Sequence, residues 1–336
     1  MSDLIKTTRI VLASRPKGMP TQSNFRSETI ALPGLQPGEV LVQGLYYSVD
    51  PYMRGRMNEG ESYVPPFQLD HSIDGSVIGK VTNSLSDKFE KGDIVIGALP
   101  WQQESIVADG NVKLLHPTIS PISYYLGVLG MTGLTAYLGL MHIGQPKPGE
   151  TVFVSGAAGA VGLVVGQIAK LQGCHVVGIS GSDEKARLLK EQFGFDEVIN
   201  YKTTADMQQA VRAACPKGVD IYFDNVGGEL SDAVMSSINV HARIPLCGQI
   251  SLYNTTQIAV GPRLQPILLT RSSLMQGFLV SDYRHLFPEA SVRLAQWMTE
   301  GKLKFTDTIV NGFDQLPSAL LGLFTGKNTG KMVVRA

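Results

Sequence analysis

One glycine-rich segment carries residue types and a spacing that suit phosphate binding. An apolar, β-branched run from Thr151 to Ser155 leads into Gly156-Ala157-Ala158-Gly159-Ala160-Val161-Gly162, and a helical pattern follows to about Leu171. Gly173 ends this helix, and a second apolar strand runs from Cys174 to Ser180. This order of elements is typical of a dinucleotide site, because free N–H groups and the positive dipole end at the helix start bind a pyrophosphate.

The turn departs from the G-x-G-x-x-G pattern at one position, where Ala157 replaces the first glycine. Gly159 still lets the backbone approach a pyrophosphate, and Gly162 permits close packing of the helix on the strand. The alternative is a glycine-rich turn in some other parallel sheet. The order of strand, turn, helix and second strand favours the dinucleotide interpretation.

The residues after the second strand indicate which dinucleotide is bound. The strand ends in Ile179-Ser180-Gly181-Ser182, without the acid that NAD binders usually carry there for the ribose hydroxyls. Asp183 and Glu184 follow and are expected to cap the next helix. Lys185 could reach back to a 2′-phosphate, although an ordinary solvated lysine is the alternative. Together these residues favour NADP over NAD.

Composition narrows the function classes. The chain has 336 residues, and its 29 Lys and Arg balance its 29 Asp and Glu, so no basic field for nucleic acid is expected. No run of eighteen apolar residues exists, which predicts no membrane span, and the N-terminal segment lacks the apolar core of a signal peptide. We therefore expect a cytoplasmic protein without membrane or nucleic-acid partners. The three cysteines, Cys174, Cys215 and Cys247, are too sparse for a disulfide framework.

The elements that must position the glycine turn follow from the pattern along the chain. About 125 N-terminal residues read as short strands of a barrel or sandwich, followed by a helix-like region at about 121–141. Strands then alternate with helices, which predicts an α/β fold with a doubly wound, six-stranded parallel sheet. The six expected strands are 151–156, 175–180, 197–201, 219–226, 242–248 and 274–280. Apolar residues at helical spacing predict helices at 288–299 and 316–324. Strands at 302–310 and 330–336 are expected to rejoin the first domain.

Several long segments resemble one known family over the whole chain. They are SVDPYMRGRM at 48–57, GMTGLTAYLGL at 130–140, the glycine-turn segment at 155–185, FDEVINYK at 195–202, DIYFDNVGGEL at 220–230, LCGQISLYN at 246–254 and GKNTGKMVV at 326–334. The chain resembles the zinc-independent medium-chain dehydrogenase/reductase superfamily, in the branch of prostaglandin reductases, alkenal double-bond reductases and bacterial curcumin reductases. The resemblance implies a GroES-like domain at 1–127, completed by 288–336, and a Rossmann NADP-binding domain at 128–287. It also implies a homodimer.

The resemblance further implies a set of cofactor contacts. The pyrophosphate would lie on the turn, and Lys185 and Tyr201 would contact the adenosine 2′-phosphate end. Asn225 would lie along the cofactor, and the nicotinamide side would be lined by the segment from Cys247 to Tyr253. The full set is Ala157, Ala158, Gly159, Ala160, Val161, Gly162, Ser182, Lys185, Tyr201, Asn225, Cys247, Gly248, Gln249, Ile250, Ser251, Leu252, Tyr253, Phe278, Leu279, Val280 and Asn328.

Zinc alcohol dehydrogenases share this fold, so a metal must be considered. Their catalytic zinc needs an early cysteine and a G-H-E histidine. Here Asp50 stands near the place of the cysteine, and Asp70-His71 lacks the glutamate partner. Three protein ligands for zinc cannot be assembled, and we expect no metal.

The resemblance implies reduction of the C=C bond of α,β-unsaturated ketones and aldehydes, with NADPH delivering hydride to the β-carbon. The developing enolate would be stabilised by Tyr253, by Tyr52 or by a ribose hydroxyl, and a tyrosine with an ordinary pKa of ~10 acts as a proton donor at neutral pH. The alternative for each tyrosine is a pocket wall. Loops at 57–70 and 253–270 would shape the pocket, and the apolar run at 261–269 favours a hydrophobic substrate. A quinone reductase, a non-catalytic NADPH-binding protein and an alcohol dehydrogenase are the alternative functions.

Overall fold

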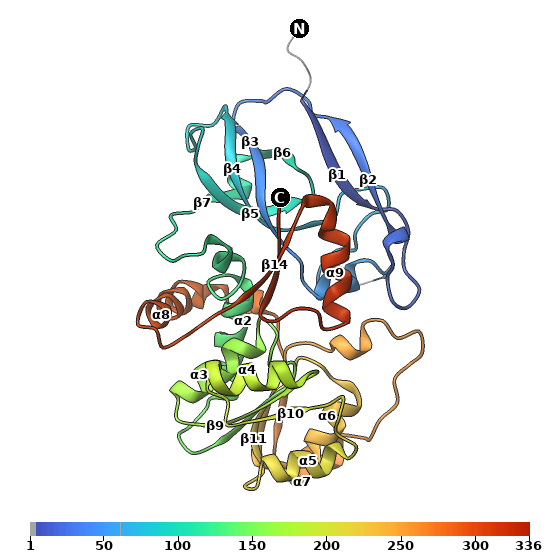
Figure 1. Cartoon of the computed structure of the whole chain (residues 1–336), viewed down its shortest axis with the longest axis vertical. Helices are drawn as coiled ribbons and strands as arrows, with labels where there is room; N and C mark the ends of the chain where they lie inside the picture. Colours follow the sequence, from blue (N-terminus) through green and yellow to red (C-terminus); the bar gives the residue numbers. More distant parts are fainter. Residues whose placement is uncertain (1–4, 61) are drawn as a thin grey trace. The chain divides into compact units, whose positions relative to one another are not determined.

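The computed structural model describes residues 5–60 and 62–336. The chain forms two compact units (Figure 1). Unit 1 comprises Met1–Leu126, Asp307–Lys327 and Met332–Ala336, and unit 2 comprises Gly127–Thr306 and Asn328–Lys331. The C-terminal segment therefore contributes to both units.

Unit 1 is rich in β-structure, as the sequence predicts. Its larger sheet has the strand order β14-β15-β3-β4-β5-β7, with β6 paired to β3. The pairs β15·β3, β3·β4, β3·β6, β4·β5 and β5·β7 are antiparallel, and a separate antiparallel sheet pairs β1 with β2. The strands are β1 (Lys6–Leu12), β2 (Phe25–Ala31), β3 (Glu39–Ser48), β4 (Asp74–Ser84), β5 (Ile94–Pro100), β6 (Glu104–Ala108), β7 (Val112–Leu114), β14 (Asp307–Asn311) and β15 (Lys331–Arg335).

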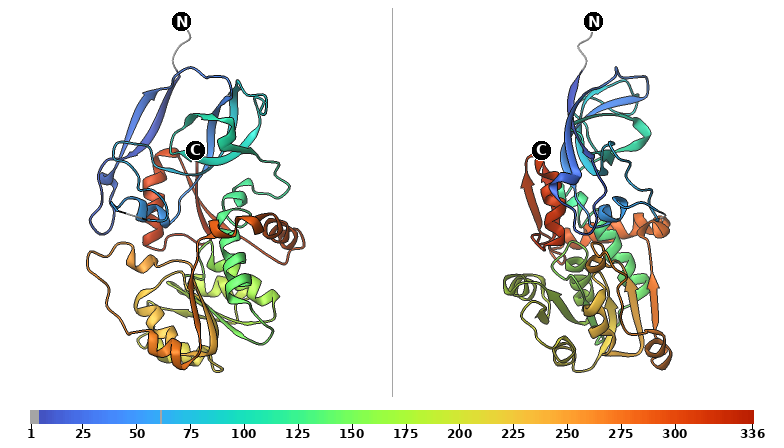
Figure 2. Two further views of the ribbon diagram at one scale, coloured as in Figure 1. Left: turned by 180° about the vertical axis from the view of Figure 1, so that it is seen from behind. Right: turned by 90° about the vertical axis from the view of Figure 1, so that its right-hand side faces the viewer.

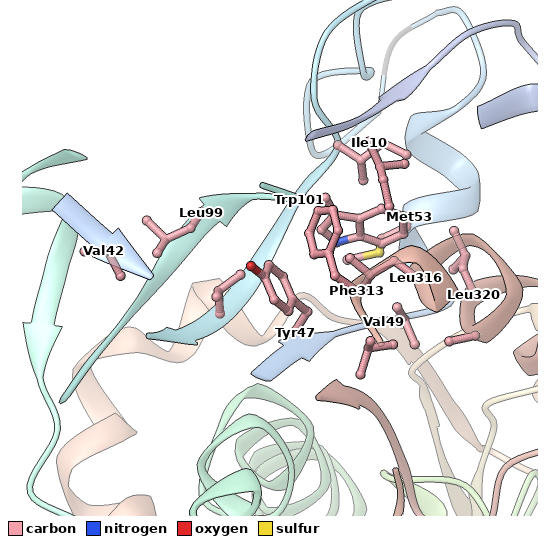
Figure 3. Close-up of a cluster of buried hydrophobic side chains, with 14 of the residues drawn as sticks. Ile10, Val42, Tyr47, Val49, Met53, Leu99, Trp101, Phe313, Leu316 and Leu320 are labelled. Atoms are coloured by element: carbon pink, nitrogen blue, oxygen red, sulfur yellow. The ribbon is translucent and has the colours of Figure 1, made fainter. Parts of the chain in front are cut away.

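The core of unit 1 joins the two ends of the chain. Helix α9 (Leu316–Phe324) lies beside the N-terminal strands of this unit (Figures 1 and 2) and buries Leu316 and Leu320 in the same cluster as Met53 from helix α1 (Tyr52–Arg56). The Tyr47 ring meets the Phe313 ring edge-on at 5.4 Å between centroids (Figure 3). Burial of these large side chains is the main stabilising contribution, at roughly 1.5–3 kcal/mol each. The C-terminal elements β14, α9 and β15 belong largely to unit 1, and the two strands lie at one end of its larger sheet.

Unit 2 contains the doubly wound sheet. All six predicted strands form, in the parallel order β10-β9-β8-β11-β12-β13. They are β8 (Thr151–Val154), β9 (His175–Ser180), β10 (Glu197–Asn200), β11 (Val219–Phe223), β12 (Ile238–Leu246) and β13 (Leu274–Gly277). The strand order reverses between β8 and β11. In open α/β sheets the ligand crevice lies at the carboxyl ends of the strands at such a reversal, so we expect the site at these strand ends.

The helices of unit 2 include two departures from the sequence-based expectation. The predicted loop at 253–270 contains a short helix, α7 (Gln265–Thr270), which starts with Pro266 in its first turn, where the missing N–H has no consequence. Helix α8 (Phe287–Thr299) belongs to unit 2, whereas the boundary expected at 287/288 assigns it to the first domain. It packs on α2 (Met131–Leu138), with the rings of Tyr137 and Trp297 at 5.9 Å.

The remaining elements are short. The crossover helices are α3 (Gly162–Leu171), α4 (Asp183–Phe193), α5 (Met207–Ala214) and α6 (Gly228–Met235). A π-helical turn follows α2 at Gly139–Gly144, and 3₁₀ turns occur at Gln22–Asn24, Asp109–Asn111, Ile122–Leu126, Ile250–Leu252, Val280–Leu286 and Phe313–Gln315. Over residues 5–60 and 62–336, no helix combines the length and apolar character needed to cross a membrane.

Candidate active site

The glycine turn closes tightly between β8 and α3. Gly156 has a φ of +60°, and the Gly159 N–H donates to its carbonyl oxygen at 2.9 Å. A Cβ on Gly162 would lie 2.4 Å from that same oxygen, so only glycine fits where α3 starts. Within the described part of the chain, the N–H groups of Ala160 and Val161 donate to no protein acceptor. The turn therefore offers free donors at a helix start, as phosphate binding requires.

The replacement of the first glycine by Ala157 has a structural explanation. Ala157 is fully buried, and its N–H donates to the Ile179 carbonyl at 3.1 Å. A Cβ on Gly178 of β9 would lie only 2.9 Å from the Ala157 Cβ. The neighbouring strand thus lacks a side chain at the place that the alanine methyl occupies, and the turn tolerates the substitution.

A polar cluster forms beyond the carboxyl end of β9. Ser182 is the N-cap of α4, and its hydroxyl accepts from the Lys185 N–H at 3.2 Å. The Lys185 ammonium donates to the Asn328 carbonyl at 2.7 Å. A Cβ on Gly181 would lie 2.8 Å from the Tyr201 hydroxyl, which therefore lies over the strand end. The structure brings together Ser182, Lys185, Tyr201 and Asn328, four residues predicted to contact the cofactor.

The capping expectation for α4 is wrong in one respect. Asp183 and Glu184 lie in the first turn of the helix, where their charges favour the positive dipole end, but the cap is Ser182. Asp183 instead accepts from the Asn200 side chain at 2.7 Å. Partial burial and the charge of Lys202 lower the pKa of the Lys185 ammonium, which places a second cation near this cluster.

The C-terminal segment 328–331 lies along the glycine turn. The Gly330 N–H donates to the Ala158 carbonyl at 2.8 Å, and Gly330 forms an isolated β-bridge with Gly159. A Cβ on Gly330 would lie 1.9 Å from the Thr306 carbonyl oxygen, so this close approach requires glycine. Asn328, placed at the cofactor by resemblance alone, is held here through this contact.

Asn225 lies where β8 and β11 end side by side. Its side-chain amide donates to the Ser155 carbonyl at 2.7 Å, and its N–H donates to the Ser155 hydroxyl at 2.8 Å. This residue therefore stands at the reversal of strand order, and its contact with the cofactor stays a prediction from the resemblance.

A cavity of about 400 Å³ opens beyond the carboxyl ends of β12 and β13. Six predicted residues line it, together with Leu246, Gly277 and Asp282, which the sequence analysis did not identify; the six are Cys247, Gly248, Gln249, Tyr253, Phe278 and Leu279. The predicted residues Ile250, Ser251 and Leu252 form the 3₁₀ turn before Tyr253, and Val280 starts the next turn.

The Tyr253 phenol is oriented by the backbone. Its oxygen accepts a hydrogen bond from the Gln249 N–H at 3.3 Å, which leaves the hydroxyl hydrogen able to donate to a substrate. Burial raises the pKa of this phenol, and the charge of Asp224 adds to the effect. Tyr253 is therefore a protonated donor in the wall of a largely apolar cavity.

Tyr52 belongs to unit 1. It is the first residue of α1, is half-buried and packs against the hydrophobic core of that unit. Burial, followed by the charge of Asp50, raises the pKa of its phenol. Its catalytic role stays a prediction.

Two sequence families match the chain. One, described as the N-terminal domain of oxidoreductase, matches residues 8–115, and another, described as zinc-binding dehydrogenase, matches residues 160–297. YfmJ of Bacillus subtilis is 55% identical over 97% of both chains. The NADPH-dependent curcumin reductase of Escherichia coli is 44% identical over 98% of this chain and 97% of its own. The chain belongs to the medium-chain dehydrogenase/reductase family. Within it, the chain falls in the branch of curcumin, alkenal and prostaglandin reductases.

This medium-chain reductase uses NADP(H). The crystal structure of CurA from Vibrio vulnificus in complex with NADPH has a TM-score of 0.94, with 45% identity over 98% of this chain and 99% of that chain. The residues of unit 2 fit the cofactor, since free N–H groups at the start of α3 suit a pyrophosphate and the Lys185 ammonium suits a 2′-phosphate.

The residues of this medium-chain reductase do not fit a zinc ion, although one matching family is described as zinc-binding. Among residues 5–60 and 62–336, no three His, Cys, Asp or Glu side chains come together as metal ligands. Asp50 is buried and bonded to the Ser48 hydroxyl, whereas the exposed His71 ring contacts the Leu69 carbonyl at 2.9 Å. Cys174 and Cys215 are buried, and Cys247 lines the cavity.

Proposed function

We propose that this protein is an NADPH-dependent reductase of the C=C bond of α,β-unsaturated ketones and aldehydes. The observation that carries the proposal is the Tyr253 phenol, a protonated donor in the wall of the cavity at the carboxyl ends of β12 and β13. The name of the E. coli relative supports the substrate class, because curcumin is a conjugated ketone. Apolar walls from Leu246, Phe278 and Leu279 favour a hydrophobic substrate.

The proposed chemistry needs only hydride transfer and a hydrogen-bond donor. Bound NADPH supplies the hydride for the β-carbon of the substrate. The Tyr253 hydroxyl donates to the carbonyl oxygen as negative charge develops there, and one such donor in a water-poor site contributes ~3–4 kcal/mol. Tyr52 is the second candidate donor. Proton delivery to the α-carbon comes from a tyrosine or from water.

Different parts of the cofactor meet different groups of the predicted residues. The turn Ala157–Gly162 holds the pyrophosphate, and the cluster of Ser182, Lys185, Tyr201 and Asn328 holds the 2′-phosphate end. Asn225 lies along the cofactor. The segments Cys247–Tyr253 and Phe278–Val280 line the nicotinamide side.

The function is tested by monitoring the oxidation of NADPH by stopped-flow absorbance. The substrates are enones and enals of graded chain length. We expect turnover that improves with apolar chain length until the cavity is filled. A simple quinone is compared under the same conditions. Faster turnover of the quinone than of every enone would assign the protein to quinone reduction, and tight NADPH binding without any turnover would assign it to cofactor binding alone.

We also propose that the protein is a homodimer paired through β13. This strand lies at the edge of the unit 2 sheet, and its Leu274 side chain is 49% exposed. Val240 on the preceding strand is 53% exposed. An uncovered edge strand with exposed apolar side chains is a template for pairing with another chain.

Leu274→Glu is expected to shift the protein from dimer to monomer, because it places a charge on that edge. Light scattering coupled to gel filtration measures the mass. Val292→Glu is the matched control, since Val292 is a 69% exposed apolar residue on α8. A monomeric wild-type protein, or a Leu274→Glu dimer of unchanged mass, would contradict this interface.

The proposal includes a cytoplasmic location and no nucleic-acid or membrane partner. The 29 basic and 29 acidic residues balance, so the protein has no net positive charge to attract a nucleic acid or an anionic membrane. Cell fractionation tests the location directly.

A further inference from the structure

Asp224 is a fully buried carboxylate at the heart of unit 2. It directly follows β11 and has no exposed surface. Among residues 5–60 and 62–336, no Lys, Arg or His forms an ion pair with it. Six neutral donors surround it instead: Ser155 Oγ at 2.9 Å, Tyr222 OH at 2.8 Å, Val226 N at 2.9 Å and Gly227 N at 3.0 Å on Oδ1, and Ser231 Oγ and Gln249 Nε2 at 3.1 Å on Oδ2. A buried charge is tolerated when it is hydrogen-bonded to this degree.

These contacts join three strand ends. The Ser155 hydroxyl comes from the end of β8 and also accepts from the Asn225 N–H at 2.8 Å. The Asp224 carbonyl accepts from the N–H groups of Cys247 and Gly248, at 2.8 and 3.1 Å, just after β12. One residue thus fixes the carboxyl ends of β8, β11 and β12, which is where the site lies.

One of the six donors, Gln249, also hydrogen-bonds through its backbone to Tyr253, the candidate proton donor. The Gln249 side chain donates to Asp224, while the Gln249 N–H donates to the Tyr253 hydroxyl oxygen at 3.3 Å. Gly227, with a φ of +71°, leaves space for this side chain, because a Cβ there would lie 2.0 Å from Gln249 Oε1. The backbone that orients the phenol is therefore tied to the carboxylate through a single side chain.

We propose that Asp224 is the positioning residue of this site: its carboxylate locks three strand ends together and, through Gln249, holds the Tyr253 phenol in the cavity. The residue acts through Gln249 and is not itself a catalytic residue. The effect on turnover rests on the proposed enone reduction, whereas the placement of the charge can be tested without it.

The effect of the Asp224 charge on a neighbouring thiol can be measured independently of enone reduction. Burial, reinforced by the Asp224 charge, raises the pKa of the Cys247 thiol to about 12. The same charge contributes to the raised pKa values of Tyr222 and Tyr253. Besides Cys247 and Tyr253, the cavity wall carries the ionisable side chain of Asp282. Removing the charge therefore lowers the pKa of the Cys247 thiol and increases its thiolate fraction.

Asp224→Asn separates the positioning role from general packing. The amide keeps an oxygen for the four donors on Oδ1, but it removes the negative charge and presents an NH₂ group to Gln249, so the charge-assisted bond from Gln249 Nε2 is lost. We expect kcat with an enone to fall about 10- to 100-fold, the range for a displaced catalytic group, with the KM for NADPH changed less than about threefold. Alkylation of Cys247 by iodoacetamide at fixed pH, located by peptide mass spectrometry, should accelerate.

Asp220→Asn is the matched control. Asp220 lies on the same strand, accepts from the Thr151 N–H and the Asn239 amide at 2.8 Å each, and stands at the opposite end of β11. We expect wild-type kcat and wild-type alkylation of Cys247 in this variant. A second variant, Gln249→Leu, breaks the link but keeps the charge, and should lower kcat without accelerating alkylation.

The outcomes are distinct. Wild-type kcat in either Asp224→Asn or Gln249→Leu overturns the positioning role, as does an equal loss in Asp220→Asn. If Asp224→Asn does not fold, Gln249→Leu decides alone. If the wild-type protein reduces no enone, the proposed function fails, and alkylation then decides the placement of the charge: acceleration in Asp224→Asn but not in Asp220→Asn supports it, and equal rates overturn it.

Discussion

Tyr253→Phe is expected to lower kcat for a good enone substrate by about 10²- to 10³-fold, which corresponds to loss of one preorganised donor to the developing oxyanion. The phenylalanine ring keeps the apolar contacts of the cavity wall and removes only the hydroxyl. Because the lost interaction strengthens as charge develops, kcat and kcat/KM should fall together, while the Kd for NADPH stays within about twofold. Stopped-flow NADPH oxidation and fluorescence titration of NADPH measure these quantities.

The pH dependence of the wild-type enzyme should report the same group. Burial raises the pKa of the Tyr253 phenol, so the donor is present at neutral and mildly alkaline pH and is lost only as the pH rises through that raised pKa. We therefore expect an alkaline decline in kcat that is absent in Tyr253→Phe. If kcat still declines at alkaline pH in this variant, the decline reports the titration of another group.

Tyr52→Phe is the comparison that separates the two candidate tyrosines. Tyr52 has a half-buried phenol with a raised pKa in unit 1, so the same substitution there removes the same chemical group. A large loss in Tyr52→Phe with wild-type kcat in Tyr253→Phe would transfer the donor role to Tyr52. Wild-type kcat in both variants would mean that cofactor geometry supplies the rate without either phenol.

The sheet of unit 2 was predictable because its strands are short apolar runs that alternate with helices. Periodicity and punctuation by glycine are local signals, and they place all six strands. The short helix α7 escaped prediction since six residues with a proline give no helical period. The assignment of α8 to unit 2 depends on its packing against α2, which no local pattern encodes.

Parts of the candidate site that lie within one continuous segment were predictable, whereas parts that depend on contacts between distant segments were not. The glycine turn and Lys185 follow from one continuous segment. By contrast, the tolerance of Ala157 depends on Gly178 in the next strand, and the place of Asn328 depends on the contact of Gly330 with the turn. Asp224 was missed although it ends a buried strand, because its importance lies in donors from four different segments.

Lys185→Ala should abolish most of the preference for NADPH over NADH. The Lys185 ammonium is half-buried and fixed by the Asn328 carbonyl at 2.7 Å, so a 2′-phosphate would meet a preorganised cation. A hydrogen bond to a charged group contributes about 1.5–3 kcal/mol, which predicts a rise of about 10- to 150-fold in the Kd for NADPH. The Kd for NADH should change by less than about twofold, because NADH lacks that phosphate.

Lys190→Ala is the matched control for this prediction. Lys190 lies on the same helix, but its ammonium pairs with Glu197 at 3.1 Å on the exposed surface, where such a pair contributes little. Because burial and Lys202 lower the pKa of Lys185, its charge is lost at a lower pH than that of an ordinary lysine. The wild-type preference for NADPH should therefore decline on the alkaline side, while the Lys185→Ala protein shows no such decline. Equal losses of NADPH and NADH binding in Lys185→Ala would instead identify a structural role for this lysine in holding Asn328 against the cofactor site.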